Sequence, residues 1–192
     1  MKSSKFIILK ILILFLLFNC GGAKSEAELA KENRDYNNLK ALVDTKAINF
    51  KAKASFPMQS NAVVNVTTAL LRTTGSNGSR QDLTGNGDYI KVIKDSVSGD
   101  LAYFGELRVA GYASANDAGI KFNGEPINYV VLENDKKKDV TIKFKIKNRN
   151  EQFDVVMVLF PNKSANVSIY SANRTGIRYS GTIESVDVDE DL

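Results

Sequence analysis

The strongest constraint on the fold is a strict two-residue alternation in the C-terminal half of the chain. Between Val140 and Lys147, apolar side chains alternate with Thr and Lys at every position. Successive side chains of a strand point to opposite faces, so this pattern predicts a β-strand with one buried and one solvated face. The following stretch, Phe153 to Phe160, is apolar on both faces, as expected of a covered central strand.

Short turns connect these strands to two further strand candidates. Pro161-Asn162-Lys163 leads into Ala165 to Tyr170, and Ala172-Asn173-Arg174 leads into Ile177 to Ile183. Connections this short join antiparallel neighbours, so the C-terminal half predicts a meander. Because an amphipathic meander must bury its apolar face, we expect a mainly β protein whose antiparallel sheet closes into a sandwich or a partly open barrel.

Nearer the N-terminus, the sequence predicts one helix followed by a strand. A helix is expected over residues 26–43, and Ser25 and Glu28 have the spacing of a capping box at its start. From Ile48 to Phe56 the period changes to two, which predicts a half-buried strand that Pro57 ends.

The middle of the chain is less regular, and turn-forming residues divide it. Besides a turn at Asn123-Gly124, we expect two connecting segments, a loop from Thr74 to Asn86 and a charged hairpin tip from Asn134 to Lys138. One strand candidate, Ala62 to Thr73, precedes the loop, and three lie between the loop and the hairpin tip: Tyr89 to Ile93, Gly119 to Phe122 and Ile127 to Glu133.

The first twenty residues have the pattern of a bacterial lipoprotein signal peptide. Lys2 and Lys5 precede an apolar run from Ile11 to Phe18, and the only cysteine of the chain, Cys20, follows. A membrane-spanning helix needs about 20 predominantly apolar residues, so this shorter run favours a signal peptide. Asn19 is larger than the residue that usually precedes a lipidated cysteine, and an uncleaved anchor or an ordinary secretory signal are the alternatives.

Cleavage before Cys20 would leave a short lipidated tether, residues 20–25, one β-rich domain, residues 26–186, and an acidic tail, residues 187–192. The leader holds three of the 26 basic residues and none of the 22 acidic ones, so the remainder is nearly neutral. This balance gives no basis for nucleic-acid binding.

The chain contains no histidine, which excludes histidine acid–base chemistry, and we expect no cofactor.

Several short motifs, taken in order, resemble a family of Bacteroidetes lipoproteins known as DUF4251, a domain of unknown function. The resemblance covers about residues 40–184. It rests on Val43-Asp44-Thr45-Lys46, Pro57-Met58, Tyr103-Phe104-Gly105, Gly119-Ile120-Lys121-Phe122 and Arg174-x-x-Ile177-x-Tyr179-x-Gly181. It implies a secreted or lipid-anchored β domain with no assigned activity, so no catalytic residues are carried over.

Three groups of residues are candidate sites outside the leader. Tyr103, Phe104 and Tyr112 could line a ligand pocket or pack in the core. Arg174 and Arg178 could bind a carboxylate or phosphate, or instead form a surface ion pair or stack on Tyr179. Ser96, in Asp95-Ser96-Val97, matches a short acceptor pattern for O-glycosylation of Bacteroidetes envelope proteins. The acidic tail lacks the glycine turn of a calcium loop, so no metal site is predicted.

These observations favour a non-catalytic lipoprotein of the bacterial cell envelope, lipidated at Cys20 and held at the outer membrane. It would be a binding or assembly module with a protein, glycan or lipid partner. The alternative is a carrier of a small hydrophobic ligand inside a barrel-like cavity, which an interior filled by Phe144, Phe153 and Phe160 would argue against. A hydrolase that uses carboxylates alone, such as Asp154 or Glu184, is a third hypothesis, but the sequence contains no flanking pair of acids.

Overall fold

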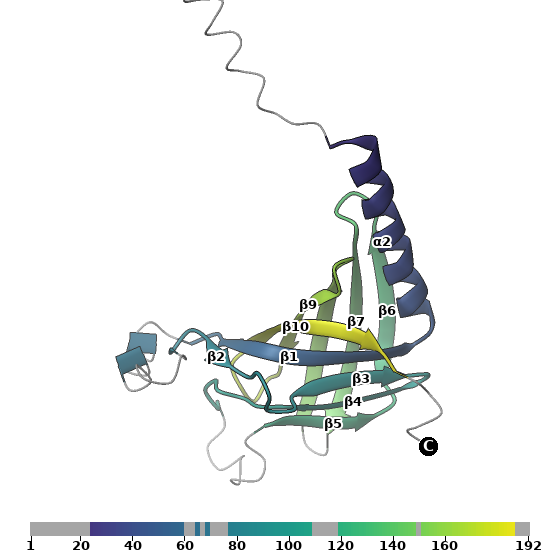
Figure 1. The fold of residues 1–192 in the computed structure, drawn as a ribbon. Coiled ribbons are helices and arrows are strands. Elements are labelled where there is room, and N and C mark those ends of the chain that lie inside the picture. Colours follow the sequence, from purple (N-terminus) through teal and green to yellow (C-terminus); the bar gives the residue numbers. More distant parts are fainter. Residues whose placement is uncertain are drawn as a thin grey trace, which may run out of the picture. The chain divides into compact units, whose positions relative to one another are not determined.

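The computed structural model describes residues 24–59, 64–65, 68–69, 77–108, 119–148 and 151–186. The chain divides into two units, Met1–Asn33 and Arg34–Leu192, each considered by itself. Among the described residues, the labelled elements are α2 (Glu26–Asp44), β1 (Ala47–Pro57), β2 (Gln81–Asp82), β3 (Tyr89–Ile93), β4 (Ser96–Leu101), β5 (Ile120–Gly124), β6 (Ile127–Asn134), β7 (Asp139–Asn148), β8 (Glu151–Leu159), β9 (Ser164–Tyr170) and β10 (Ile177–Ser185) (Figure 1).

In the first unit, the described residues form the start of α2. The Ser25 backbone N–H donates to Glu28 Oε2 at 3.0 Å, and the Glu28 N–H donates to Ser25 Oγ at 3.2 Å. The two side chains thus satisfy backbone donors that a helix start leaves free. The capping box predicted from the sequence is confirmed.

The second unit is built on one antiparallel sheet of ten strands. Its order is β5-β4-β3-β1-β10-β9-β8-β7-β6, and β2 pairs with β1 beside this path. The strands form two meanders, β3 to β5 and β6 to β10. β1 joins them, because it pairs with β3 on one side and with β10 on the other. The sheet curls as a half-barrel, with β3, β4 and β5 running across the strands of the other half (Figure 1). Of the two arrangements expected from the sequence, the partly open barrel is confirmed.

The pairing of β1 with β10 requires a glycine in β10. Gly181 lies opposite Ala52, next to a shift in the register of β1. A Cβ atom at Gly181 would lie 2.0 Å from the backbone oxygen of Lys51. The backbones approach too closely there for any side chain, which explains the glycine in the closing motif of the sequence.

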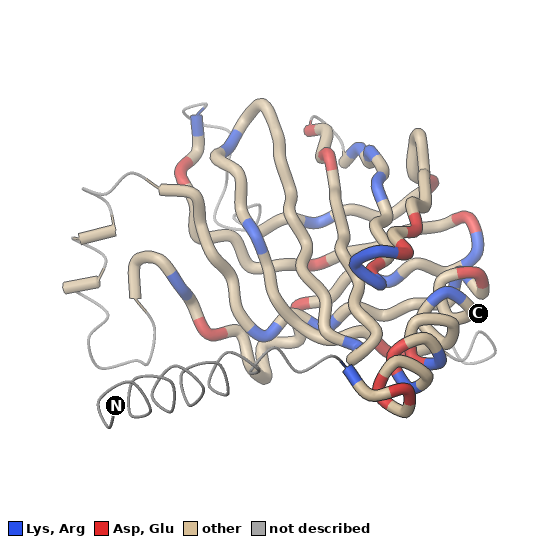
Figure 2. The backbone as a smooth tube through the Cα atoms, turned by 90° about the horizontal axis from the view of Figure 1, so that it is seen from above, with Lys and Arg blue, Asp and Glu red and all other residues tan. Residues whose placement is uncertain are grey.

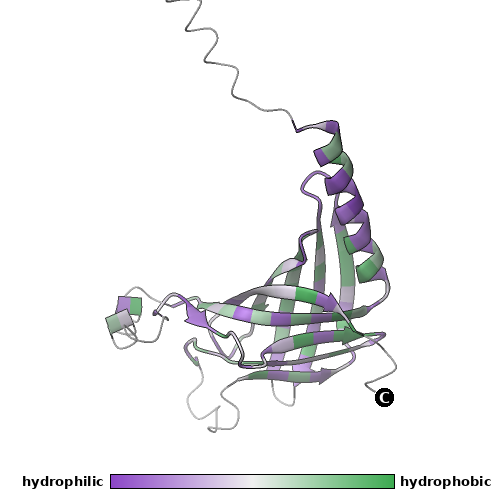
Figure 3. Ribbon diagram, viewed as in Figure 1, coloured by the Kyte–Doolittle hydropathy of each residue, from purple (hydrophilic) through white to green (hydrophobic). Residues whose placement is uncertain are grey.

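Apolar and polar residues alternate along the strands, as the colours in Figure 3 show, and this alternation separates a buried face from a solvated one. In β7 the buried apolar residues are Val140, Ile142, Phe144 and Ile146, and Asp139 at the start of the strand is buried as well. Charged residues of both signs are interspersed along the described strands and helix (Figure 2). Burial of the apolar face supplies the main favourable contribution to folding.

Aromatic rings fill the interior of the curl. The Phe122 ring centroid lies 6.5 Å from that of Phe144 and 6.0 Å from that of Phe153. Gly99 makes room for this cluster, because a Cβ atom there would lie 2.6 Å from the Phe122 ring. Phe160, expected to help fill the core, is only half-buried beyond the end of β8.

Within this unit, the second half of α2 packs against the sheet. Tyr36, Leu39 and Val43 are buried at a spacing that places them on one face of the helix. Lys40 Nζ lies 3.5 Å from Glu133 Oε2, which ties the helix to β6.

The middle of the chain differs from its prediction in three places. The expected strand from Ala62 to Thr73 is wrong, since residues 64–65 and 68–69 are helical. One edge of β1 is paired with β10 and the other with β3 and β2, which leaves that segment no place beside β1. The expected loop from Thr74 to Asn86 contains β2, which pairs with β1. The turn expected at Asn123-Gly124 falls at residues 125–126 instead, because β5 continues to Gly124.

Candidate functional site

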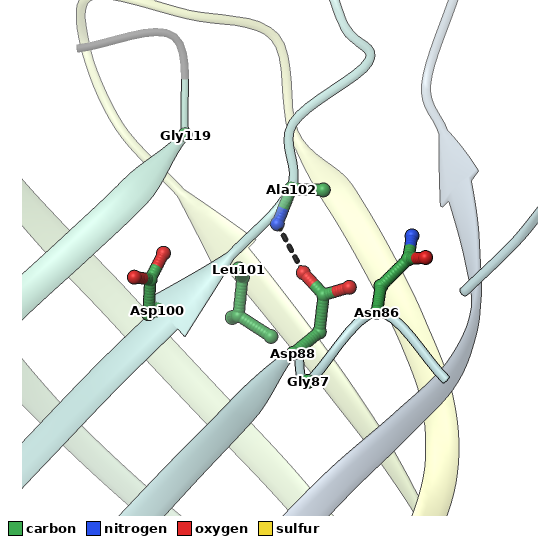
Figure 4. A pocket seen from close by; sticks show the side chains of 7 residues that line it. All are labelled: Asn86, Gly87, Asp88, Asp100, Leu101, Ala102 and Gly119. Atoms are coloured by element: carbon green, nitrogen blue, oxygen red, sulfur yellow. Dashed lines mark hydrogen bonds between the residues drawn. The ribbon is translucent and has the colours of Figure 1, made fainter. Parts of the chain in front are cut away.

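A polar hollow of about 260 Å³ lies where the ends of three strands meet in the second unit. Residues before β3, at the end of β4 and before β5 surround it (Figure 4). They combine two carboxylates, one carboxamide and exposed backbone: Asn86, Gly87, Asp88, Asp100, Leu101, Ala102 and Gly119. Binding sites typically combine such convergent polar groups with a concave surface.

Asp88 is the most unusual residue of this hollow, because only 7% of it is exposed. One carboxylate oxygen, Oδ1, accepts a hydrogen bond from the backbone N–H of Ala102. The other, Oδ2, is buried and has no hydrogen-bond partner among the described residues. A buried polar atom without a partner costs free energy, so this oxygen marks a place where a donor would be stabilising.

Burial raises the pKa of the Asp88 carboxyl above its usual value, and the negative charge of Asp100 raises it further. Both effects disfavour the ionised form of Asp88. The hydrogen bond from Ala102 acts in the opposite direction but does not cancel them. Asp88 therefore combines low exposure, a free acceptor and a shifted pKa, which are features that gather at functional sites.

Asp100 and Asn86 provide more accessible polar groups at the rim. Asp100 Oδ2 lies 3.2 Å from Lys121 Nζ, and both side chains are about half exposed. Asn86 is exposed, and its backbone N–H donates to the Leu83 carbonyl at 3.0 Å. Figure 4 shows the Asp88 carboxyl between Ala102 and Asn86. Hydroxyl or amino groups of a ligand would find several hydrogen-bond acceptors here.

Ala102 is held from both sides, which fixes one wall of the hollow. Its N–H donates to Asp88, and its carbonyl accepts a hydrogen bond from Tyr179 Oη at 2.9 Å. Burial raises the pKa of Tyr179 well above 10, and the charge of Asp88 adds to the shift. The tyrosine therefore stays protonated and remains a donor to Ala102.

Arg174, a predicted anion contact, already has a carboxylate partner within the chain. Its Nε lies 2.9 Å from Glu151 Oε1, and its Nη2 lies 2.7 Å from Glu151 Oε2. Both side chains are only 4% exposed. The third nitrogen, Nη1, donates to the Gly119 carbonyl at 3.1 Å, so that all three guanidinium nitrogens have partners.

The predicted aromatic cluster divides into a packed residue and an exposed one. Tyr103 is partly buried, its Oη lies 2.9 Å from the Thr175 carbonyl, and its ring lies 4.8 Å from the Arg174 guanidinium. Phe104 is exposed. Tyr112 lies outside the described residues.

The other candidate residues lie apart from the hollow. Arg178 is exposed on β10, and its guanidinium lies 4.9 Å from the ring of its cross-strand neighbour Phe56. Ser96 is exposed at the hairpin between β3 and β4, where an enzyme could reach it. Cys20 and the acidic tail are outside the described residues.

Asp154 and Glu184, the acids of the hydrolase hypothesis, each face a lysine. Asp154 Oδ1 lies 3.4 Å from Lys145 Nζ, and Glu184 Oε1 lies 2.6 Å from Lys51 Nζ. The ion pair with Lys51, followed by the hydrogen bond from Asn49, lowers the pKa of Glu184. A lowered pKa is the reverse of what a general acid at neutral pH requires.

Sequence reasoning missed Asp88 as a site residue. The only local signal is the Asn86-Gly87-Asp88 turn before a strand, and such turns are common. The wall formed by Ala102 and Gly119 comes from distant parts of the chain, so no spacing pattern reveals it. In the part of the chain that the structure describes, no group of three or more acids, histidines or cysteines could hold a metal ion. Among the same residues, no helix is long and apolar enough to span a membrane.

Comparisons with known proteins point to one family. The family model of a domain of unknown function, DUF4251, matches residues 30–183. The crystal structure of a DUF4251 family protein from Bacteroides eggerthii superposes with a TM-score of 0.54 at 15% sequence identity, over 81% of this chain and 91% of that one. The similarity to this structure is a similarity of fold. A comparison with curated proteins gives no match.

The raised pKa of Asp88 predicts how its replacement changes stability with pH. Because the folded-state pKa lies above the unfolded one, wild-type stability is fully present below the unfolded pKa, near 4, and falls as pH rises through the folded value. In Asp88→Asn the amide oxygen can still accept a hydrogen bond from the Ala102 N–H. Because asparagine does not ionise, the loss of stability with rising pH disappears. Urea unfolding should therefore show the variant gaining stability relative to wild type between pH 4 and pH 7.

Asp100→Asn is the matched control, since Asp100 is half exposed and paired with Lys121. It should change the pH dependence much less than Asp88→Asn does. A stability difference between Asp88→Asn and wild type that stays constant from pH 4 to pH 7 would contradict the assignment.

Proposed function

The chain belongs to the DUF4251 family, and we propose that it is a non-catalytic binding module of the bacterial cell envelope. In this proposal a lipid on Cys20 holds it at the outer membrane, and the hollow around Asp88 takes one sugar residue of a glycan. The family is a domain of unknown function, and the chemistry of the hollow is what points to this ligand.

The observation that carries the proposal is the convergence of Asp88, Asp100 and Asn86 on a hollow of about 260 Å³. Drug-sized ligands occupy pockets of about 300–1,000 Å³, so this one suits a single small ring. Sugars present many hydroxyl donors, and carboxylate and carboxamide oxygens accept from them. Gly87 is exposed and has no side chain, which leaves its backbone open to the ligand.

The interior of the sheet supports recognition at the surface rather than transport inside a cavity. The rings of Phe122, Phe144 and Phe153 are buried and lie against one another in the curl. A carrier of a hydrophobic ligand would need that space. The polar hollow lies at the strand ends, where an envelope glycan could reach it.

Binding of simple sugars tests the proposed site. The full chain, labelled with ¹⁵N, would be titrated with glucose, galactose and N-acetylglucosamine at millimolar concentrations and followed by amide chemical shifts. We expect shifts for Asn86, Gly87, Ala102 and Gly119 with at least one sugar. Asn86→Ala should weaken binding about fivefold, the effect of losing one hydrogen bond of about 1 kcal/mol.

The control variant is Asn123→Ala, which removes an exposed carboxamide on β5 that does not line the hollow. It should bind the same sugar with unchanged affinity. The proposed site would be wrong if no sugar shifted these amides, or if both variants lost affinity equally.

Lipidation is tested separately in a Bacteroidetes host fed an alkyne-tagged fatty acid. The wild-type chain should carry the tag and sediment with the outer membrane, whereas Cys20→Ser should carry none and be released, because Cys20 is the only cysteine. Asn19→Gly, with the small residue that lipoprotein signals usually have there, should retain the tag. An untagged wild-type chain, or equal tagging of Cys20→Ser, would refute the anchor.

A further inference from the structure

Exposed apolar side chains are concentrated on one strand of the sheet. Among the described residues, nine large hydrophobic side chains are exposed, and four of them belong to β6. These four, which are 39% to 46% exposed, are Ile127, Val130, Val131 and Leu132. Exposed apolar residues are ordinarily scattered singly, so a run of them indicates a surface that another molecule covers.

β6 is also an edge of the sheet, because the only described strand it pairs with is β7. An edge strand presents backbone N–H and C=O groups to which another strand can add. The strand is well fixed, since the Tyr129 ring stacks on Phe144 at 6.1 Å and Glu133 pairs with Lys40. The part from Val130 to Asn134, which follows a shift in register with β7 after Ile127, is therefore a regular template for pairing.

The opposite edge of the sheet, β5, is already engaged within the chain. The Asn148 side chain donates to the Lys121 carbonyl at 2.5 Å, and the Phe122 side chain is buried. A β5 edge occupied in this way disfavours head-to-tail addition of β6 to β5 of another molecule. The alternative is that β6 pairs with β6 of a second copy about a two-fold axis. Such a contact gives a closed dimer.

The apolar residues of β6 match themselves in one antiparallel register. Val130 and Leu132 lie opposite Lys143 and Thr141 of β7, on its solvated face, whereas Val131 lies opposite the buried Ile142. With Val131 on the two-fold axis, Leu132 meets Val130 of the partner subunit on the same face. The exposed apolar side chains then cover one another.

Charges at the two ends of β6 are complementary in this register. Glu125 precedes the strand, and the turn that follows it contains Lys136 and Lys137, all of them exposed. Antiparallel pairing brings this turn, which lies beyond the end of β6, close to Glu125 of the partner subunit, and the two-fold axis repeats this contact. Opposite charges favour the pairing and its direction.

We propose that β6 is a dimer interface, in which two copies of the chain pair their β6 strands antiparallel about an axis at Val131. The occupant of this edge is thus a second copy of the same chain. The proposal is independent of sugar binding and of lipidation.

Disulfide trapping tests the axis directly in the full chain with Cys20→Ser, in which an added cysteine is the only thiol. Opposite residues of an antiparallel pair have Cα atoms about 4.5–5.5 Å apart, within the range of a disulfide. Val131→Cys should therefore form a covalent dimer on mild oxidation. Ile127→Cys, on the same strand and similarly exposed, should not, because the two introduced cysteines would lie more than about 20 Å apart.

The molecular mass in solution gives a second readout without a cysteine. The Cys20→Ser chain should be a dimer by light scattering, and Leu132→Lys, which places a charge on the edge, should make it a monomer with unchanged circular dichroism. Leu107→Lys, at a similarly exposed leucine away from β6, should leave the dimer intact. A monomeric parent chain, a dimer unaffected by Leu132→Lys, or equal trapping at positions 127 and 131 would overturn the proposal.

Discussion

The buried ion pair between Arg174 and Glu151 joins segments that no short-range contact could bring together. Glu151 begins β8, Arg174 lies in the turn before β10, and the guanidinium also donates to the carbonyl of Gly119, the residue before β5. Ser171 Oγ adds a hydrogen bond to Glu151 at 2.5 Å. A buried charge costs several kcal/mol unless it is paired and hydrogen-bonded, so each partner specifies the position of the other. The pair thereby connects the two meanders at one end of the curl.

The same connection places the candidate site. Gly119 accepts the hydrogen bond of Arg174 and lines the polar hollow, while Ala102, on another wall, is held by Asp88 and Tyr179. The walls of the hollow thus come from the β3–β5 meander, and Arg174 and Tyr179 of the other meander hold two of them in place. The curl also brings Phe122 of β5 against Phe144 and Phe153. These contacts occupy the β5 edge of the sheet. The other edge, β6, is apolar and exposed, and it is the edge at which we propose that two copies pair.

Local sequence patterns predicted the strands whose signal is contained in neighbouring residues. The alternation from Val140 to Lys147 became β7, and the capping box at Ser25 formed as expected. Pairing of Ile48 with Ser185 has no local signal, so the joining of the two meanders could not be predicted. The β-branched stretch from Ala62 to Thr73 has strand propensity, but β1 already has partners at both edges, and tertiary structure overrides such propensity. The partners of Arg174 and the burial of Asp88 likewise depend on contacts between distant residues.

A double-mutant cycle on Arg174 and Glu151 tests most directly whether their ion pair holds the curl. Arg174→Met and Glu151→Gln should each lower the free energy of unfolding by about 3–5 kcal/mol, because each leaves a buried partner without its charge or hydrogen bonds. The double variant should lose much less than the sum of the two, and the single variants should shift the amide resonances of Gly119 and Ala102. Losses below about 1 kcal/mol that add in the double variant would contradict this account.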